Sequence, residues 1–456
     1  MRLLFDHGTL VLTEAPELNA ARVPGLLWDR RIALFRAPAW LYCEVLAALR
    51  HSAPPLRDEV APSSLPRPAA WRPVPLRPYQ QAALLSWELS GRRGIVSLPT
   101  GSGKTQVAIA ALAARGVRAL CLVPTRALLE QWTAAIRTAY TGPIGRLGDG
   151  HRDLTAVTIS TFESAYRLMP RIGAQFELLV VDEAHHFGTG ARDEALEMAI
   201  APERLGLTAT PPAEPALTRL SELIGPVVYR LAIADLAGTW LADFDLLPVH
   251  LGLAPDERSA YDADRRLFNE VYRRYRRLDP LATWRDFVTA VALSPEGRAA
   301  LAAWRRNRRL LQFTRAKADA VRVLLARHRD SRVLIFTADN ESAYAIAREQ
   351  LVMPITCDIS RPEREAALAA FRLGQLRTLV SARVLNEGID VPEADVAIVV
   401  GGTQGEREHI QRVGRLLRPV QGKRARIYEL VTRATSEGWR AAERRRALAP
   451  AGVARR

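Results

Sequence analysis

Lysine is scarce in this chain. Of its 64 basic residues only Lys104, Lys317 and Lys423 are lysines, and the other 61 are arginines. This skew indicates a compositional bias, of the kind that GC-rich coding or adaptation to heat produces, and it says little about function by itself. One lysine nevertheless lies in a glycine-rich loop, where a compact ammonium on a flexible stem reaches phosphate groups and a planar guanidinium fits poorly.

Cysteine is scarce too, and long apolar runs are missing. Cys43, Cys121 and Cys357 are far apart, so no CxxC pair or set of four thiolates exists to hold zinc or an iron–sulfur cluster. No apolar run reaches the roughly 18 residues of a membrane span, and the start MRLLFDHGTL lacks the regions of a signal peptide. We therefore expect a soluble, cytoplasmic protein in a reducing compartment, without a membrane partner.

Acidic side chains are outnumbered by basic ones. The 456 residues include 49 acidic side chains, and the formal net charge is +15 with an isoelectric point near 10.4. Many arginines would release counterions from a phosphate backbone, so this charge favours a polyanionic partner. The alternative is a basic surface that only aids solubility. The length exceeds one hydrophobic core and favours about two to four domains.

Two series of short apolar runs predict two parallel sheets. The first series is GIVSL at 94, ALCLV at 119, AVTIS at 156, LLVV at 178 and RLGLTA at 204. The second series is VLIFT at 333, PIT at 354, TLVSA at 378, VAIVV at 396 and RIYELV at 426. Helical patterns alternate with these runs, which is typical of sheets covered by helices on both faces. We predict an α/β fold with two doubly wound lobes, whose ligands lie at the carboxyl ends of the strands.

The other segments connect or extend these lobes. Residues 52–78 are rich in proline, which interrupts helices and strands, so we predict a linker after a small N-terminal module. Within that module a helix is predicted over 38–50, with Pro38 at its start. Residues 255–312 lack strand runs and are predicted to be helical, and the arginine-rich tail 433–456 is expected to fray.

A candidate phosphate loop, PTGSGKT, occupies residues 99–105 between a predicted strand and a predicted helix. Gly101 and Gly103 permit a tight loop whose N–H groups face phosphates, and the helix N-terminus adds a favourable dipole. Lys104 would reach the β- and γ-phosphates of ATP, and the threonine after it would hold Mg²⁺. The usual pattern has glycine where this chain has Leu98, and a chance glycine loop is the alternative. The expected ligands of ATP and Mg²⁺ here are Thr100, Gly101, Ser102, Gly103, Lys104 and Thr105.

An acidic pair follows the apolar run at 178–181. Carboxylates at the end of a buried strand are costly unless a metal or a base role employs them. We assign Asp182 to Mg²⁺ through water and Glu183 to the polarisation of the attacking water. A helix cap is the alternative for DEAH taken alone. Together with the phosphate loop, the pair predicts an ATP-hydrolysing centre.

Positive charge must close the far side of a triphosphate and stabilise the transferring phosphoryl group. The segment QRVGRLLRP at 411–419 offers Arg415 and Arg418, which are three residues apart and so share one helix face. Its first residue, Gln411, is a further candidate catalytic side chain. A salt-bridged surface helix is the alternative in an arginine-rich chain.

These segments resemble, in order, the motif series of superfamily 2 helicases, whose members commonly lack the first loop glycine. The series also includes LRPYQQAAL at 76, VPTRALLEQW at 123, LTATP at 207 and ARVLNEGIDVPEAD at 382. The closer resemblance, over 22–448, is to the XPB-type helicases in their short archaeal and bacterial forms. It rests further on LLWDRRIALFRAPAW at 26, LAGTWLADFDLLPVHLGLAPDERSAY at 236 and FTADNESAYAIA at 336.

The resemblance implies a domain plan. Two RecA-like lobes would occupy 69–246 and 313–456, with a helical thumb-like insertion at 247–312 between them. A small α+β domain that resembles the damage-recognition domain of the family, with its linker, would occupy 1–68.

The resemblance also implies roles in the nucleotide site. Arg77 and Gln80 would contact adenine. Gly388 and Asp390 would lie close to the ribose and the γ-phosphate when the lobes close.

Other roles implied by the resemblance concern coupling. Thr208 and Thr210 would link hydrolysis to lobe movement, and His185 would lie near the boundary between the ATP and nucleic-acid sites. Arg415 and Arg418 would be arginine fingers that the second lobe supplies to the phosphate loop.

Nucleic acid is expected along the basic, aromatic-bearing helical segment and along lobe 1. Tyr261, Phe268 and Tyr272 fall on one helix face and are expected to pack in a core, although an exposed aromatic ring could stack on bases. The arginines nearby would neutralise phosphates or form a solvated face. The candidate nucleic-acid contacts are Arg126, Thr161, Arg273, Arg274, Arg276 and Arg277.

The implied function is ATP-dependent 3′ to 5′ movement on single-stranded or forked DNA in repair, by a monomer with an XPB-associated nuclease as a partner. The family usually has an Arg-Glu-Asp element after LTATP, whereas this chain has PPAEPALTRL at 211–220. A duplex-DNA translocase that does not open strands is therefore a rival hypothesis. Two further hypotheses are an RNA helicase and a nucleotide-gated scaffold with an inactive centre.

Overall fold

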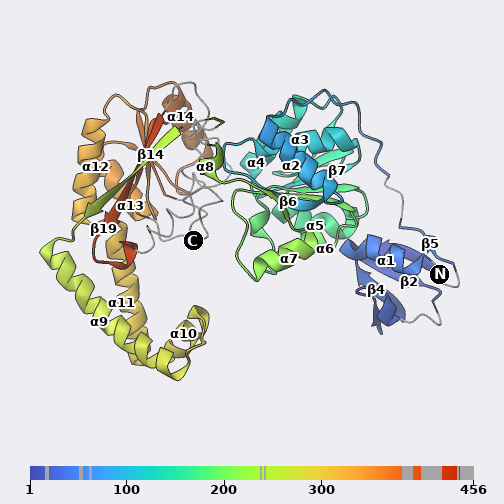
Figure 1. Ribbon diagram of the computed structural model, residues 1–456, viewed down its shortest axis with the longest axis horizontal. Coiled ribbons are helices and arrows are strands. Elements are labelled where there is room, and N and C mark those ends of the chain that lie inside the picture. The colour runs from blue at the N-terminus through green and yellow to red at the C-terminus, as the bar shows by residue number, and fades with distance from the viewer. Residues whose placement is uncertain are drawn as a thin grey trace. The chain divides into compact units, whose positions relative to one another are not determined.

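The computed structural model divides into two compact units, Met1–Leu231 and Ala232–Arg456, which are described separately (Figure 1). The residues that it describes are 1–15, 20–50, 55–60, 64–236, 239–240, 243–382, 394–401, 424–438 and 441. No helix in these ranges is long and apolar enough to cross a membrane.

A small α+β domain opens the first unit. Its sheet has the order β3-β4-β2-β1-β5, with antiparallel neighbours except for the parallel pair of β1 and β5. The strands are β1 (Arg2–Asp6), β2 (Thr9–Thr13), β3 (Leu27–Asp29), β4 (Leu34–Pro38) and β5 (Arg57–Asp58), and the helices include η2 (Ala39–Leu41) and α1 (Tyr42–Leu49).

Two local predictions for this domain need correction. The proline-rich segment 52–78 contains strand β5, because Arg57 donates its N–H to the carbonyl of Met1 at 2.9 Å and so extends the sheet beside β1. Pro38 precedes a 3-10 turn instead of an α-helix, and α1 begins only at Tyr42.

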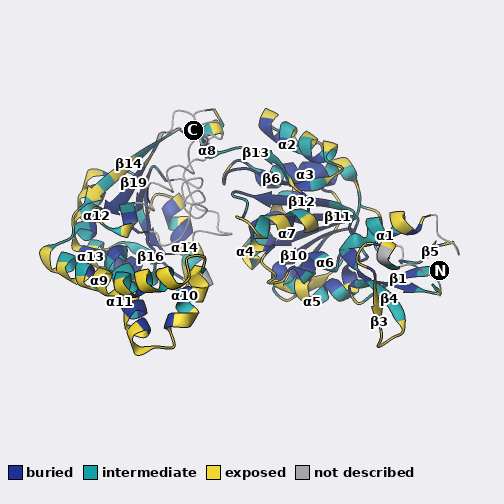
Figure 2. Ribbon diagram, turned by 60° about the horizontal axis from the view of Figure 1, so that its bottom comes forward, coloured by how far each residue is buried: buried dark blue, intermediate teal, exposed yellow. Residues whose placement is uncertain are grey.

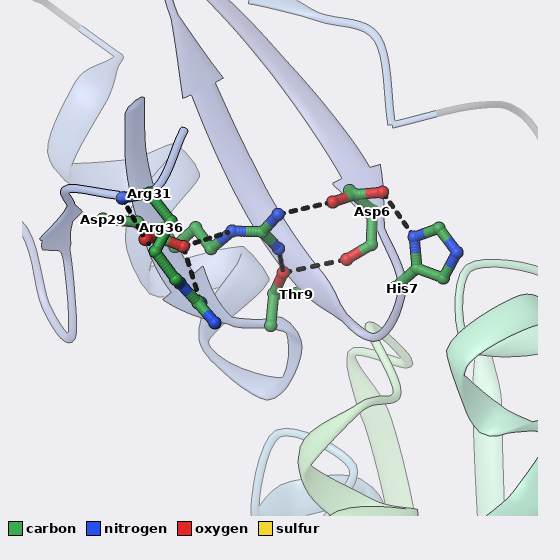
Figure 3. A network of polar contacts seen from close by, with 6 residues as sticks. All are labelled: Asp6, His7, Thr9, Asp29, Arg31 and Arg36. Atoms are coloured by element: carbon green, nitrogen blue, oxygen red, sulfur yellow. Dashed lines mark hydrogen bonds and ion pairs between the residues drawn. The ribbon is translucent and has the colours of Figure 1, made fainter. Parts of the chain in front are cut away.

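A polar network ties the β1–β2 turn to β3 and β4 (Figure 3). Arg36 donates to Thr9 Oγ1 and to Asp6 Oδ2, each at 2.6 Å, and its Nε lies 3.2 Å from Asp29 Oδ2. Hydrogen bonds from Arg31 lower the pKa of Asp29 to about 2. The domain thus holds its hairpins together on a partly exposed side with charge-assisted hydrogen bonds.

Lobe 1 is the parallel sheet that follows in the same unit, with its helices. Its order is β13-β6-β12-β11-β7-β10-β8-β9, and every neighbouring pair is parallel except β8 and β9. The strands are β6 (Arg93–Ser97), β7 (Ala119–Val123), β8 (Ile144–Gly148), β9 (His151–Asp153), β10 (Val157–Thr161), β11 (Leu178–Val181), β12 (Glu203–Thr208) and β13 (Val227–Arg230). The five runs predicted here are strands, as expected.

Helices cover the buried strands of lobe 1 (Figure 2). They are α2 (Pro78–Leu89), α3 (Lys104–Arg115), α4 (Arg126–Arg137), α5 (Phe162–Ile172), η3 (Ala184–His186), α6 (Glu194–Glu197) and α7 (Ala216–Leu223). Since β6, β12 and β11 are neighbours and parallel, their carboxyl ends meet at one edge. The phosphate loop, the threonine at the end of β12 and the acidic pair after β11 therefore come together.

Lobe 2 is the parallel sheet of the second unit. Its order is β14-β19-β18-β15-β17-β16. The strands are β14 (Asp243–Leu251), β15 (Val333–Phe336), β16 (Met353–Ile355), β17 (Thr378–Ser381), β18 (Val396–Val399) and β19 (Arg424–Thr432), and the helices are α8 (Ile233–Leu236), α12 (Arg315–Arg327), α13 (Asn340–Gln350) and α14 (Arg361–Arg372). Together with lobe 1, this sheet confirms the predicted pair of α/β lobes.

Strand β14 corrects the predicted boundaries at 246 and 247. It pairs with β19 along its whole length, from Asp243 opposite Arg424 to Leu251 opposite Thr432. The second lobe therefore starts inside the range assigned to the first and takes in the start of the predicted insertion. Its proline, Pro248, lies in an edge strand of the described sheet, where a missing N–H is tolerated.

The thumb, residues 255–312, is helical as expected. Its helices are α9 (Pro255–Leu278), α10 (Trp284–Val291) and α11 (Pro295–Gln312) (Figure 1). The predicted aromatic stripe packs in the core of the thumb, because Phe268 and Tyr272 place their rings 6.0 and 5.0 Å from that of Phe287. Tyr261 is 3% exposed.

Candidate active site

The phosphate loop depends on two glycines with left-handed backbone. Gly101 has φ 85° and Gly103 has φ 81°, a region that L-residues with a Cβ rarely adopt. A Cβ on Gly103 would also lie 2.6 Å from Nε2 of Gln80. Helix α3 begins immediately, at Lys104, so the open N–H groups of its first turn adjoin the loop.

Helix α2 braces this loop from the side. The carbonyl of Ser102 accepts hydrogen bonds from Tyr79 Oη at 2.6 Å and from Gln80 Nε2 at 2.9 Å. Gln80 Oε1 in turn accepts the backbone N–H of Arg77 at 2.9 Å. Gln80 therefore positions the loop, and its contact with adenine, like that of Arg77, stays a prediction. Tyr79 was missed, although it lies within the LRPYQQAAL motif.

Lys104 is buried but chemically open. The residue is 9% exposed, and its ammonium makes no hydrogen bond or ion pair with any residue that the structure describes. Thr105 follows in the first turn of α3 and is half-buried. Leu98, where the usual motif has glycine, is fully buried before the loop.

Asp182 is held by a hydrogen bond on each carboxylate oxygen. Oδ1 accepts the backbone N–H of Glu183 at 2.9 Å, and Oδ2 accepts the indole N–H of Trp132 at 2.8 Å. Burial, and next the charge of Glu183, raise the pKa of Asp182 to about 6, while Lys104 and these hydrogen bonds oppose the rise. A carboxylate in this environment gains from a cation beside it.

Glu183 has a strained backbone, with φ 47° and ψ 48°. A residue with a side chain adopts this left-handed region at a cost of about 1–2 kcal/mol, and such strain clusters at functional sites. Its Oε2 is buried, lies 3.4 Å from His185 Nδ1 and makes no hydrogen bond within the described ranges.

A short polar chain links the acidic pair to the neighbouring strand. His185 Nδ1 lies 3.1 Å from Oγ1 of Thr208, which ends β12. That hydroxyl donates to the carbonyl of Thr210 at 3.0 Å and accepts its N–H at 3.2 Å. The structure thus connects all three predicted coupling residues with one another and with Glu183.

The residues present fit a nucleoside triphosphate with a divalent cation. Three buried oxygens, Thr100 Oγ1, Glu183 Oε2 and Thr210 Oγ1, find no hydrogen-bond partner among the described residues. Buried polar atoms are normally satisfied, so oxygens left open around a glycine loop indicate a place for ligand groups. The lysine supplies positive charge for phosphate, and the carboxylates and hydroxyls are the oxygen ligands that Mg²⁺ prefers.

Comparisons with known proteins identify the family of this chain. The family models that match are the type III restriction enzyme res subunit at residues 73–213, the helicase conserved C-terminal domain at 316–420 and the xeroderma pigmentosum group B helicase damage recognition domain at 3–60. The chain is 34% identical to the "DNA 3'-5' translocase XPB2" of Sulfurisphaera tokodaii, over 94% of this chain and 97% of that protein.

The chain belongs to the XPB family of superfamily 2 helicases. A further relative in this family, the "Putative DNA 3'-5' helicase Rad25" of Halobacterium salinarum, is 31% identical over 98% of this chain and 70% of its own length. The Pyrococcus furiosus Hef helicase domain matches with a TM-score of 0.52 and 17% identity over 81% of this chain and 98% of that one, which shows the fold alone. Membership of the XPB family confirms the resemblance and the RecA-like lobes, and it implies the use of ATP.

The predicted nucleic-acid residues of this XPB-family chain lie in two places. Arg126 begins α4 and forms an exposed ion pair with Asp149 at 3.0 Å, and Thr161 ends β10. Both therefore lie at the carboxyl edge of the sheet, Thr161 as the last residue of β10 and Arg126 shortly after β7. Thr161 is buried and caps α5 by accepting the N–H of Ser164 at 3.3 Å, so its hydroxyl already has a structural role.

The thumb arginines differ from one another. Arg274 pairs with Glu296, and Arg276 donates to the carbonyl of Ala282 at 2.8 Å. Arg273 and Arg277 make no ion pair or hydrogen bond within the described ranges. Together with Arg274 they line an open hollow of about 850 Å³ on α9. The predicted residues Gly388, Asp390, Gln411, Arg415 and Arg418 lie outside the described residues.

Proposed function

We propose that this chain is an ATP- and Mg²⁺-dependent motor that moves 3′ to 5′ on DNA. The observation that carries the proposal is the convergence of three side chains at one edge of the lobe 1 sheet. Lys104 and Oε2 of Glu183 have no hydrogen-bond partner among the described residues, and hydrogen bonds hold the carboxylate of Asp182. The names of the relatives, DNA 3'-5' translocase and DNA 3'-5' helicase, support DNA as the track and this polarity.

Each residue would have a distinct role in hydrolysis. Lys104 would neutralise the β- and γ-phosphates, and Thr105 and Asp182 would hold Mg²⁺, which supplies positive charge to the transferring group. Glu183 would orient and polarise the attacking water, since its buried Oε2 has no hydrogen-bond partner among the described residues and its backbone is strained. Arg415 and Arg418 would add charge from the second lobe.

Coupling to movement would pass through the polar chain from Glu183 to Thr210. His185 and Thr208 join the strand that ends in the acidic pair to the strand beside it. A change at the γ-phosphate that moves Glu183 would therefore also move His185 and Thr208, at the end of β12. We propose that the resulting lobe movements advance the protein along one strand, gripped by Arg126 and the thumb arginines.

The test is ATP turnover with equal lengths of single-stranded DNA and RNA, measured for the wild-type protein and for Lys104→Ala. We expect DNA to stimulate turnover more than RNA, and the variant to lose the stimulated rate. An equal or greater response to RNA would favour an RNA helicase. Full stimulated turnover in Lys104→Ala would overturn the proposed site and would favour a different nucleotide centre.

A second candidate is a translocase on duplex DNA that does not separate strands. The segment after LTATP carries no Arg-Glu-Asp triplet, and in the structure Glu214 accepts from Thr218 N at 3.1 Å to begin α7. Displacement of a third strand from a triplex, without displacement of a strand from a forked duplex, would establish this candidate. Efficient opening of the fork would remove it.

We propose a role in DNA repair, because one matching family model is a damage recognition domain. We also propose that a separate nuclease makes any incision, because the sequence motifs of this chain are those of an ATPase and none is typical of a nuclease. We further propose that the chain acts as a monomer. Co-purification of a nuclease with the tagged protein and light scattering of the purified chain test these two statements.

A further inference from the structure

Trp132 lies in the core of lobe 1, next to the candidate metal site. Helix α4 buries Leu129, Trp132, Thr133 and Ile136, which follow the i, i+3, i+4, i+7 pattern of one helix face. Trp132 is 1% exposed. Its position alone indicates a packing residue, as expected for a large apolar ring in a core.

The polar end of the ring has a more specific partner. An indole carries one N–H donor and no acceptor, and Trp132 gives that donor to Oδ2 of Asp182 at 2.8 Å. The other carboxylate oxygen, Oδ1, accepts the backbone N–H of Glu183 at 2.9 Å. An ionised carboxylate has about four lone-pair positions, so these two bonds fix its rotation and leave one position on each oxygen for a ligand.

A second buried tryptophan in the same lobe provides a comparison. Trp87 on α2 is fully buried and donates its indole N–H to the carbonyl of Arg204 at 2.9 Å. Arg204 lies near the start of β12, at the end of the strand opposite Thr208. Trp87 therefore donates to a backbone carbonyl far from the carboxyl edge of the sheet. Trp132 instead donates to Asp182, the side chain assigned to Mg²⁺.

We propose that Trp132 is a positioning residue for Mg²⁺, which fixes the carboxylate of Asp182 so that one free lone pair on each oxygen faces the hydrated cation. The inference rests on the proposed function, since it takes Asp182 as the carboxylate that serves the metal. Without the indole N–H, only the backbone N–H of Glu183 orients the carboxylate of Asp182. Oδ2 then has no hydrogen bond to hold it in place. Partners that orient a metal ligand typically contribute about 10- to 100-fold to metal affinity or activity.

The experiment compares Trp132→Phe with Trp87→Phe. Both variants keep an aromatic ring in a buried site and remove one indole donor. Affinity for a fluorescent ADP analogue is titrated with Mg²⁺ and, separately, in EDTA, and ATP turnover is titrated with Mg²⁺. Thermal melting of each variant serves as the control for folding.

We expect Trp132→Phe to raise the half-saturating Mg²⁺ concentration about tenfold or more and to leave affinity in EDTA within about twofold. Trp87→Phe should leave both quantities at their wild-type values. A Mg²⁺ requirement in Trp132→Phe equal to that of the wild type, or an equal shift in both variants, would overturn the inference. Absence of DNA-stimulated turnover in the wild-type protein would instead overturn the proposed function, and the binding titration would still decide the role of Trp132.

A second measurement needs no stable Trp132→Phe variant. In wild-type protein with ¹⁵N-labelled tryptophan, the indole N–H resonances are followed while Mg²⁺ is added to the nucleotide complex. A partner of the metal-bound carboxylate should shift, and the resonance that Trp87→Phe removes should not. Unchanged indole resonances on addition of Mg²⁺ would also contradict the inference.

Discussion

The two buried lysines that the structure describes are held in opposite ways. Lys317 in lobe 2 is fully buried, and its ammonium donates to the carbonyl of Leu311 and to Oε1 of Glu437, each at 2.6 Å. Lys104 in lobe 1 is almost as buried, yet no described residue accepts a hydrogen bond from it. In a chain so poor in lysine, one lysine is fully bonded within the protein and the other has no hydrogen-bond partner among the described residues.

The carboxylates near these lysines repeat the contrast. Glu437 uses both oxygens, because Oε1 accepts from Lys317 and Oε2 accepts the N–H of Thr432 at 2.9 Å. Glu183 keeps a buried Oε2 without a hydrogen bond in the described part of the chain. A structural ion pair saturates its members, whereas a catalytic site leaves charge and lone pairs for the groups that arrive.

The closed pair gives the largest expected effect on stability. The substitution Lys317→Met on α12 leaves Glu437, which follows β19, buried without its ion-pair partner. Loss of one partner of a buried pair costs about 3–5 kcal/mol. Chemical denaturation should show this loss in the free energy of unfolding of the second unit.

The double variant Lys317→Met/Glu437→Gln controls for packing. It removes the unpaired charge while a neutral amide oxygen still accepts the N–H of Thr432. We expect the double variant to be more stable than Lys317→Met. If the single and double variants are equally destabilised, the ion pair is not the cause.

The open lysine should respond in function and hardly in stability. Lys104→Arg keeps the positive charge but replaces a compact ammonium with a planar guanidinium. We expect DNA-stimulated ATP turnover to fall by about 10²- to 10³-fold, as when a transition-state contact is lost. Urea denaturation should show a change below about 1 kcal/mol, since no described residue bonds to this ammonium. A large loss of stability would show that Lys104 has a structural role, as Lys317 does.

Thr208 stands between the two cases, because its hydroxyl is satisfied yet belongs to the open site. Thr208→Val leaves His185 and the N–H of Thr210 without this partner, at a cost of about 1–3 kcal/mol in stability. We expect DNA-stimulated turnover to persist while the amount of strand or triplex displaced per ATP drops severalfold. Turnover and displacement measured on one sample give that ratio.

Thr158→Val is the matched control for this change. Thr158 is equally buried, and its hydroxyl likewise donates to a backbone carbonyl, of Thr155 at 2.7 Å, and accepts the N–H of that residue at 3.0 Å. It lies near the start of β10, at the amino edge of the sheet, away from the acidic pair. A similar loss of stability with an unchanged displacement per ATP is expected, and an equal loss of displacement in both variants would refute the coupling role.

The site in lobe 1 could be predicted because its chemistry is local in sequence. PTGSGKT and DEAHH each carry their candidate functional atoms within a few residues, and each follows an apolar run that forms a buried strand. Parallel strands then bring their carboxyl ends to one edge whatever the loops between them. The positions of β6 and β11, and the expectation that Lys104 lies near Asp182, followed from these two facts.

Contacts between distant segments were not predictable in this way. Strand β14 was divided between two domains because its partner, β19, is far along the chain and nothing local marks the pairing. Trp132 and Asp182 are 50 positions apart, and Lys317 and Glu437 are 120 apart. A signal for Lys317 did exist, since a lysine in so arginine-rich a chain indicates a site where a guanidinium does not fit.

The contrast between open and closed cations extends to the thumb and predicts the smallest effect. Arg273 and Arg277 have no ion pair or hydrogen bond with the residues that the structure describes, whereas Arg274 and Arg276 have partners within the thumb. Each lysine or arginine that contacts a phosphate contributes about one unit to the slope of log affinity against log salt. We therefore expect Arg273→Ala/Arg277→Ala to reduce that slope by about two units, measured by DNA binding at several salt concentrations.

The variant Arg274→Ala/Arg276→Ala removes the same charge and serves as the control. Its arginines already spend hydrogen bonds on Glu296 and on the carbonyl of Ala282, so fewer donors remain for phosphate. We expect its slope to change by less than about one unit. Equal changes in both variants would show that DNA binding depends only on the net charge of the thumb. The distinction between cations with and without partners would then hold only for the two lysines.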